Sequence, residues 1–155
     1  MGKKEVVRFK RVLHVRTVER DITRSELAEQ VAEEGAILGR INDTENMRDD
    51  AVASFCVPSG GAVSPQELWF ARQSIDMMER KLADDRQELE VCRDKIEETK
   101  AELLTRHQNV QLMSRYVGRL VEKADKASLD AEQKNLDDIA SMRFKRDARQ
   151  GGASA

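Results

Sequence analysis

The sequence predicts an all-α fold, an antiparallel two-helix coiled-coil hairpin with unequal arms in which the second helix overhangs at the C-terminus. Three observations support this: a long apolar repeat in the second half, a single break in the first, and an unusual composition. The chain of 155 residues is 36% charged and only 4% aromatic, with two prolines. A compact domain of this length normally uses more aromatic and turn residues. We therefore expect one elongated domain over 6–148 and a disordered tail at 149–155.

The strongest pattern lies between Leu68 and Ala127, where steps of three and four residues pick out eighteen positions, and only Asp85, Thr99 and Arg106 among them are polar. A 3.5-residue apolar period of this length keeps one face of a helix apolar, and that face needs a partner helix to cover it. The predicted seam is Leu68, Ala71, Ile75, Met78, Leu82, Asp85, Leu89, Cys92, Ile96, Thr99, Leu103, Arg106, Val110, Met113, Val117, Leu120, Ala124 and Ala127.

The first helix is predicted over about 6–55, because no proline or turn cluster interrupts the chain before Pro58. Its seam is weaker, with six apolar residues among nine positions. Those positions are Leu27, Val31, Glu34, Leu38, Ile41, Glu45, Arg48, Val52 and Phe55. Further upstream the apolar residues are Leu13, Val15, Val18 and Ile22. The step of five from Ile22 to Leu27 predicts a drift of the seam, absorbed by a stutter.

A loop is predicted over 56–64, which contains a proline and a glycine pair. The second helix, over about 65–148, then starts with a complete N-terminal signal. Ser64 is the expected N-cap, Pro65 occupies the first helical position, and Glu67 completes a capping box. This is the most sharply defined helix boundary in the sequence.

Folding the first helix back on the second brings Phe55 near Leu68 and Val6 near Val117. The chain from Gly118 onward is then left without an intramolecular partner. This overhang carries a looser apolar stripe formed by Leu129, Leu136, Ile139, Met142 and Phe144. An apolar stripe on an unsupported helix should be covered by something outside the chain.

Nothing in the sequence indicates catalysis, a cofactor or a metal. There is no glycine-rich phosphate loop and no Cys-x-x-Cys pair. His14 and His107 are the only histidines; the hairpin places them near one another, but a metal site needs more ligands. Two paired helices also offer no concave, desolvated pocket in which to shift a carboxylate pKa. We therefore expect a protein that is not an enzyme.

The two cysteines and the hydropathy indicate a cytoplasmic protein. Cys56 lies at the loop and Cys92 far along one arm, well beyond disulfide reach, so both are expected as free thiols. No apolar run approaches the roughly 18 residues of a membrane span, so no direct membrane insertion is expected. The net charge of −2 gives no indication of nucleic-acid binding.

Two surfaces are candidates for binding partners. Near the loop, Trp69 and Phe70 follow Leu68 directly and cannot all face one seam, so at least one aromatic should be exposed, together with Met77. Alternatively, these side chains cover the loop and the last turn of the first helix. At the other end, residues 1–20 carry seven basic and two acidic side chains. The hairpin places them near the basic C-terminal residues Arg143, Lys145, Arg146 and Arg149.

The C-terminal pattern resembles that of the FliJ family, the coiled-coil stalk of the flagellar type III export apparatus. Its members often end in a Lys-x-Leu/Met-Asp-Glu/Asp-x-Ala run followed by basic residues. The matching residues here are Lys134, Leu136, Asp137, Asp138, Ala140, Arg143 and Arg146. The start of the chain, Phe9-Lys10-Arg11-Val12-Leu13-His14-Val15-Arg16, is similar to the family's opening helix.

The resemblance implies a non-catalytic stalk that contributes to flagellum biogenesis, motility and chemotaxis. Its partners would be the hexameric export ATPase, the cytoplasmic domain of the export-gate membrane protein, and export chaperones. It would lie in the cytoplasm, peripheral to the inner membrane at the flagellar base. The candidate ATPase-binding residues are Arg8, Phe9, Leu13, Leu136, Asp137, Asp138, Ala140, Arg143 and Arg146. The candidate gate-binding residues are Trp69, Phe70 and Met78.

Two alternatives stay open at the level of sequence. The chain could be a structural homodimer in which two overhangs pair with each other, or the homologous stalk of a virulence type III secretion system. A nucleic-acid scaffold is more remote, because no aromatic residues interleave with the basic ones.

Overall fold

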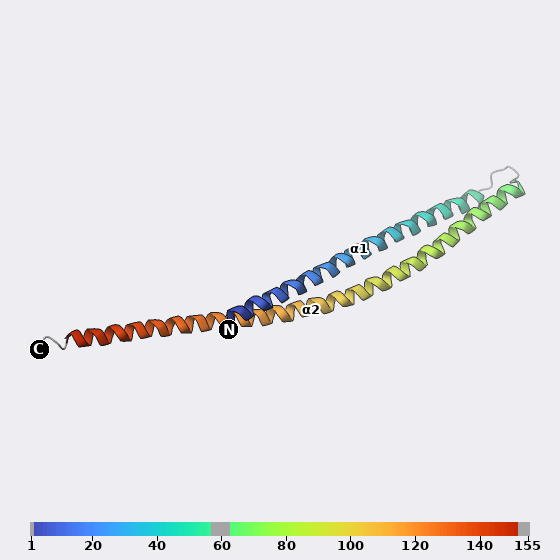
Figure 1. Cartoon of the computed structure of the whole chain (residues 1–155). Helices are drawn as coiled ribbons and strands as arrows, with labels where there is room; N and C mark the ends of the chain where they lie inside the picture. The colour runs from blue at the N-terminus through green and yellow to red at the C-terminus, as the bar shows by residue number, and fades with distance from the viewer. Residues whose placement is uncertain (1, 57–62, 152–155) are drawn as a thin grey trace. The chain divides into compact units, whose positions relative to one another are not determined.

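The computed structural model describes residues 2–56 and 63–151 and contains two helices, α1 (Gly2–Cys56) and α2 (Pro65–Gly151) (Figure 1). No strand occurs among these residues. The helices run in opposite directions and pack against each other, as ion pairs from Glu34 to Arg93 and from Arg48 to Glu79 show. The predicted fold class, an all-α helical hairpin, is confirmed.

The helices extend slightly beyond their predicted bounds. α1 begins at Gly2 rather than near residue 6 and ends at Cys56, and α2 runs to Gly151 rather than stopping near 148. Residues 149–151, predicted as disordered tail, are therefore helical, since no helix-breaking residue precedes Gly151 and a basic last turn favours the helix C-terminus. The remainder of the predicted tail, and 57–62 of the predicted loop, lie outside the described residues.

The predicted start of α2 is confirmed in atomic detail. The backbone N–H of Ser64 donates to Glu67 Oε2 at 3.1 Å, and the backbone N–H of Glu67 donates to Ser64 Oγ at 3.2 Å. These reciprocal hydrogen bonds form the capping box and satisfy backbone donors that the helix itself leaves unpaired. The sequence signal alone was sufficient here because every participating atom lies within four residues.

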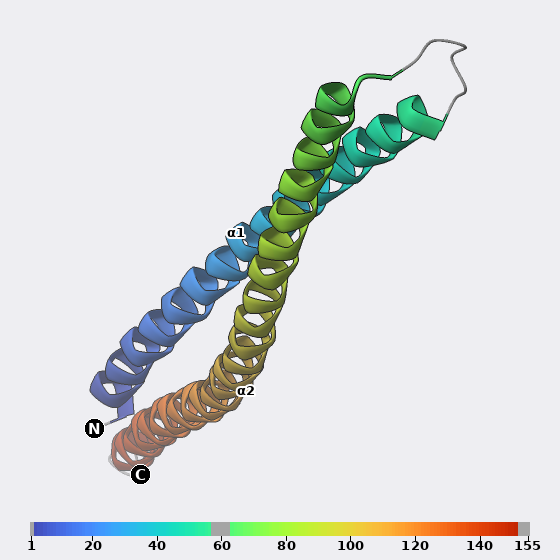
Figure 2. The ribbon, with the colours of Figure 1, turned by 90° about the vertical axis from the view of Figure 1, so that its right-hand side faces the viewer.

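The chain divides into two compact units. The terminal unit contains Met1–Glu19 and Arg106–Ala155, and the loop unit contains Arg20–Thr105. Each unit includes a piece of α1 paired with a piece of α2. In the loop unit, the two pieces lie side by side and run in opposite directions in both ribbon views (Figures 1 and 2).

The core of the loop unit is a single line of side chains between the helices. Its buried cluster consists of Ile37, Ile41, Leu82, Leu89, Cys92 and Ile96, with Leu27 packed against it. Leu82 is completely buried, with an exposed fraction of 0%. Along α2, every predicted seam position from Ala71 to Ala124 is buried or half-buried, and only the end positions Leu68 and Ala127 are exposed. The seam predicted for the second helix is thus confirmed over nearly its whole length.

The seam predicted for α1 is half wrong. The positions Leu27, Glu34, Ile41 and Arg48 do face α2. Between them, however, α2 is faced by Gln30, Ile37, Thr44 and Ala51, whereas the predicted Val31, Leu38 and Val52 are 41–49% exposed. Glu45 is half-buried, and Phe55, at the end of the helix, is exposed. The two possible seams share every second position, and at the other positions they are one residue apart, which is about 100° around the helix. Counting apolar residues selected the wrong seam.

The predicted stutter upstream of Leu27 is also absent. Thr23 is buried, which gives an ordinary step of four to Leu27, while Ile22 is exposed. Val15 and Val18, in the terminal unit, are exposed as well. Of the upstream apolar residues, Val15, Val18 and Ile22 therefore lie off the seam, Leu13 is half-buried, and Thr23 occupies the seam position next to Leu27.

Ion pairs along the rim maintain the register of the loop unit. They join Arg40 to Glu88 at 2.7 Å, Arg86 to Glu45 at 2.8 Å, Arg93 to Glu34 at 2.9 Å and Arg48 to Glu79 at 3.1 Å. Each exposed pair contributes at most about 1 kcal/mol. Their common register along the helices nevertheless disfavours a slip of one helix past the other.

Cys92 is a structural residue of this core. Its Sγ donates to the backbone carbonyl of Gln30 at 3.6 Å, and burial, with smaller contributions from Glu33 and Glu34, raises the pKa of the thiol. A protonated, buried thiol packs as a small apolar side chain. This agrees with its place in the predicted seam; the side chain of Cys56 lies outside the described residues.

Candidate partner-binding surfaces

The terminal unit contains a paired section and a single-helix extension. At the start of α1, a Cβ built on Gly2 would lie 3.7 Å from the Cβ of Ala124. The last half-buried residue of α2 is Ser128. We call residues 129–151 the overhang, and the described side chains within it, up to Gln150, are all exposed.

The overhang therefore starts about ten residues later than predicted. α1 is helical from Gly2, so it covers α2 beyond Gly118, the residue at which support was expected to end. Gly118 follows the buried Val117 inside the paired section. The prediction of an uncovered C-terminal helix stands, with a shorter length.

The overhang has the predicted apolar stripe. Leu129, Leu136, Ile139, Met142 and Phe144 are 49–77% exposed, on the part of α2 that extends past the N-terminus of the chain (Figure 1). Arg143, Lys145, Arg146 and Arg149 are interspersed with its end and follow it. An exposed helix that is apolar along one part and basic at its end is suited to bind a partner with both an apolar groove and acidic groups.

The candidate ATPase-binding residues fall into two groups. Leu136, Asp137, Asp138, Ala140, Arg143 and Arg146 lie exposed on the overhang. Of the three from α1, only Arg8 is exposed, because Phe9 and Leu13 are half-buried. The Phe9 ring packs edge-to-face on Tyr116, with ring centroids 5.1 Å apart. The residues from the two helices thus share one unit, but Phe9 and Leu13 are held partly within it.

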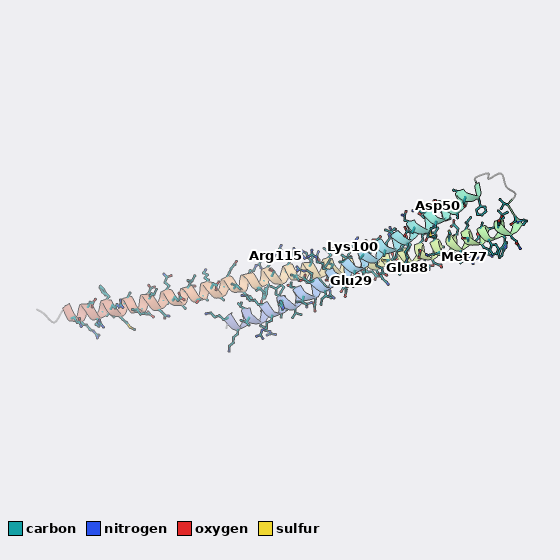
Figure 3. The ribbon with its side chains drawn as sticks, turned by 90° about the horizontal axis from the view of Figure 1, so that it is seen from above. Glu29, Asp50, Met77, Glu88, Lys100 and Arg115 are labelled. Carbon is teal, nitrogen blue, oxygen red and sulfur yellow. The ribbon has the colours of Figure 1, made fainter. Side chains whose placement is uncertain are left out.

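The loop end of α2 has the exposed apolar surface that was predicted. Trp69 and Phe70 are both exposed, and their rings pack edge-to-face with centroids 5.2 Å apart. Met77, labelled in Figure 3 on the part of α2 toward the loop, is 66% exposed. Met78 is half-buried at its seam position, so the neighbouring Met77 offers more surface to a partner.

Sequence reasoning missed one member of this surface. Met47 of α1 is exposed and lines a shallow groove with Ser74, Met77 and Met78 of α2. Thr44 and Lys81 complete the lining. Met47 was missed because the α1 seam was placed one residue away, and a correct seam with Thr44 inward would have placed Met47 beside it. Flexible methionine side chains adapt to varied partners.

The histidines do not form a recognisable site. His107 Nε2 lies 3.0 Å from the Nε2 of Gln111, one turn along α2, and His14 is exposed. Within residues 2–56 and 63–151, no group of three or more metal-ligating side chains occurs. Neither helix, over those residues, includes a stretch that is apolar enough for a membrane span.

A family model described as Flagellar FliJ protein matches residues 4–149, nearly the whole chain. The chain belongs to the FliJ family. Comparisons with curated proteins and with solved structures gave no match. Membership makes it a coiled-coil protein related to flagellar export, and the matched region contains both the overhang stripe and the aromatic residues at the loop end. The family resemblance predicted from the terminal motifs is thereby confirmed.

Proposed function

We propose that this FliJ-family chain is a non-catalytic stalk of the flagellar type III export apparatus that binds the export ATPase ring and the export gate. The observation that supports this most is the overhang, a helix of 23 residues whose apolar stripe no other part of the described chain covers. We place the chain in the cytoplasm, peripheral to the inner membrane at the flagellar base, with export chaperones as further partners.

The overhang is suited to an ATPase ring for a physical reason. In proteins most of the stability of a helix comes from packing of its apolar face, and no other part of the described chain covers the stripe of the overhang. A ring that surrounds it would bury the stripe around Leu136 and Ile139 and would pair acidic groups with Arg143 and Arg146. Asp137 and Asp138 carry the opposite charge and would set the orientation in which the ring binds the helix.

Charge reversal at the basic end tests this contact. The double variant R143E/R146E is expected to abolish stimulation of the purified hexameric ATPase, measured as phosphate release with and without the chain. The far-UV circular dichroism should stay helical, because both side chains are exposed. The matched control K95E/K100E makes the same change of charge in the loop unit and should stimulate normally. Unchanged stimulation by R143E/R146E would exclude the overhang as the contact.

We assign the export gate to the loop end. Trp69, Phe70 and Met78 were the candidates, and the exposure of Met77 and Met47 supports adding these two to the surface. Large aromatic side chains are typical anchors of protein interfaces because they bury much apolar area, and methionine is enriched there because its flexible side chain adapts to the partner.

Substitution at the loop end should separate the two partners. M77E is expected to weaken binding to the purified cytoplasmic domain of the gate protein by at least about tenfold, since it places a charge in an apolar contact. Stimulation of the ATPase should be retained. Titration calorimetry measures the first effect, with M142E in the overhang as the matched methionine control. If M77E binds the gate domain like wild type while M142E does not, the assignment of the two ends is reversed.

A further inference from the structure

Charge is divided unequally between the two units. The terminal unit has sixteen basic and nine acidic side chains, whereas the loop unit has eleven basic and twenty acidic ones. Within the terminal unit, the overhang, residues 129–151, is balanced, with five basic and five acidic side chains. The excess of seven positive charges therefore belongs to the paired section, residues 2–19 and 106–128.

The middle of the paired section contains no acidic residue. Residues 6–18 of α1 have four basic side chains, and residues 106–121 of α2 have three, with no Asp or Glu in either segment. The contact between Phe9 and Tyr116 shows that these two segments face each other. Elsewhere, the chain interleaves charges of both signs, as the ion pairs along the loop unit illustrate. A surface that carries charge of one sign raises the local concentration of ligands of the opposite charge.

An apolar groove runs through this basic region. It is lined by Phe9, Arg16, Asn109, Leu112, Met113 and Tyr116, from both helices. Leu112 is 68% exposed and Tyr116 is 44% exposed, although both line the groove beside the apolar side chains of Phe9 and Met113. Tyrosine and arginine are among the side chains most enriched at the energetic centres of interfaces. Arg16 forms an exposed pair with Glu19 at 3.7 Å, and a pair of this kind holds a side chain weakly, so Arg16 can turn to a ligand at little cost.

We propose that this groove binds an acidic amphipathic helix of a partner protein. The bound helix would lie along α1 and α2 as the third helix of a coiled coil. A groove between two packed helices is complementary in shape to the apolar stripe of a third helix. The acid-free walls favour a helix whose flanking positions are Asp and Glu. Phe9, which the family resemblance assigned to the ATPase, here forms part of the groove.

Apart from Phe9, the groove shares no residue with the ATPase and gate candidates, and the proposal uses neither the overhang stripe nor the loop end. A second copy of the chain is a less suitable occupant. The apolar stripe on the overhang of such a copy belongs to an electrically balanced helix that ends in basic residues, which the groove would repel. Charge complementarity therefore favours an acidic helix over the overhang of a second copy.

A designed peptide tests the groove directly. The probe is a fluorescein-labelled peptide of three heptads. Each heptad has leucine at its two core positions, glutamate at the positions that flank the core, and alanine elsewhere. The control peptide replaces each glutamate by lysine. Fluorescence anisotropy with the full-length chain should show the acidic peptide binding at least about tenfold more tightly than the basic one. Raising the salt from about 50 mM to about 500 mM should weaken it strongly.

Matched variants locate the binding. L112E, at an exposed position, should weaken the acidic peptide at least about tenfold, and R16E should weaken it while improving the lysine peptide. L104E makes the same change at an exposed leucine of the loop unit and should bind like wild type. Circular dichroism of each variant checks that the helices persist.

Three outcomes would overturn the proposal. Equal binding of the two peptides would remove the electrostatic argument. Loss of binding in L129E but not in L112E would place the peptide on the overhang. A chain that sediments as a dimer alone and becomes monomeric with L112E would identify a second copy as the occupant. None of these measurements contains the ATPase or the gate, so failure here leaves the proposed stalk function untouched.

Discussion

Alanine at position 37 is expected to lower the free energy of unfolding by about 2–4 kcal/mol, whereas alanine at position 38 should lower it by less than about 1 kcal/mol. Ile37 is 1% exposed in the core cluster, so its truncation removes packed atoms and leaves a cavity between the helices. Leu38 is 42% exposed on the flank of α1, where alanine removes few contacts and has a better helix propensity. The measurement is urea denaturation followed by circular dichroism at a helical wavelength.

This adjacent pair distinguishes the observed seam from the one predicted by sequence alone. V31A serves as a second flank control, because Val31 was predicted inside and is exposed. A larger loss of stability for L38A than for I37A would mean that α1 presents the other face to α2. Equal small losses for both would mean that the two helices do not form a stable core at all.

Leucine at position 85 is expected to stabilise the chain by about 1–3 kcal/mol. Asp85 lies in the seam between Leu82 and Leu89 and is only 7% exposed. Its Oδ1 accepts a long hydrogen bond of 3.4 Å from Arg40, and its Oδ2 is buried with no hydrogen-bond partner in the described structure. One weak bond does not offset the loss of water around a carboxylate.

The partner of Asp85 would not be left unpaired in this variant. Arg40 also donates to Glu88 at 2.7 Å, so D85L leaves the guanidinium with its shorter contact. Urea denaturation measures the change, and D85N is the matched control that removes the charge while keeping the size. A less stable D85L would show that the Arg40–Asp85 pair contributes net stability. If D85L is more stable, as expected, the role of the natural aspartate lies in register, since a polar seam residue disfavours slipped pairings at some loss of stability.

The candidate surfaces that could be predicted from the sequence are those whose residues lie close together in one helix. The exposed stripe on the overhang followed from residues that continue a helix after the strict seam ends, and Trp69 and Phe70 followed from their adjacency. The groove around Leu112 was not predicted. Its lining combines residues about a hundred positions apart, and only the register of α1 on α2 brings Phe9 against Tyr116.

The sequence by itself determined where α2 starts and which of its faces is buried, because a capping box and a long apolar period are read within one helix. Only the tertiary structure decided which face of α1 is buried and where the overhang begins. The first helix has apolar residues on several faces, so its own pattern is ambiguous. Packing against α2 resolved it by placing Thr23, Ile37 and Thr44 inside, since the free energy depends on how two surfaces fit and not on how apolar one of them is.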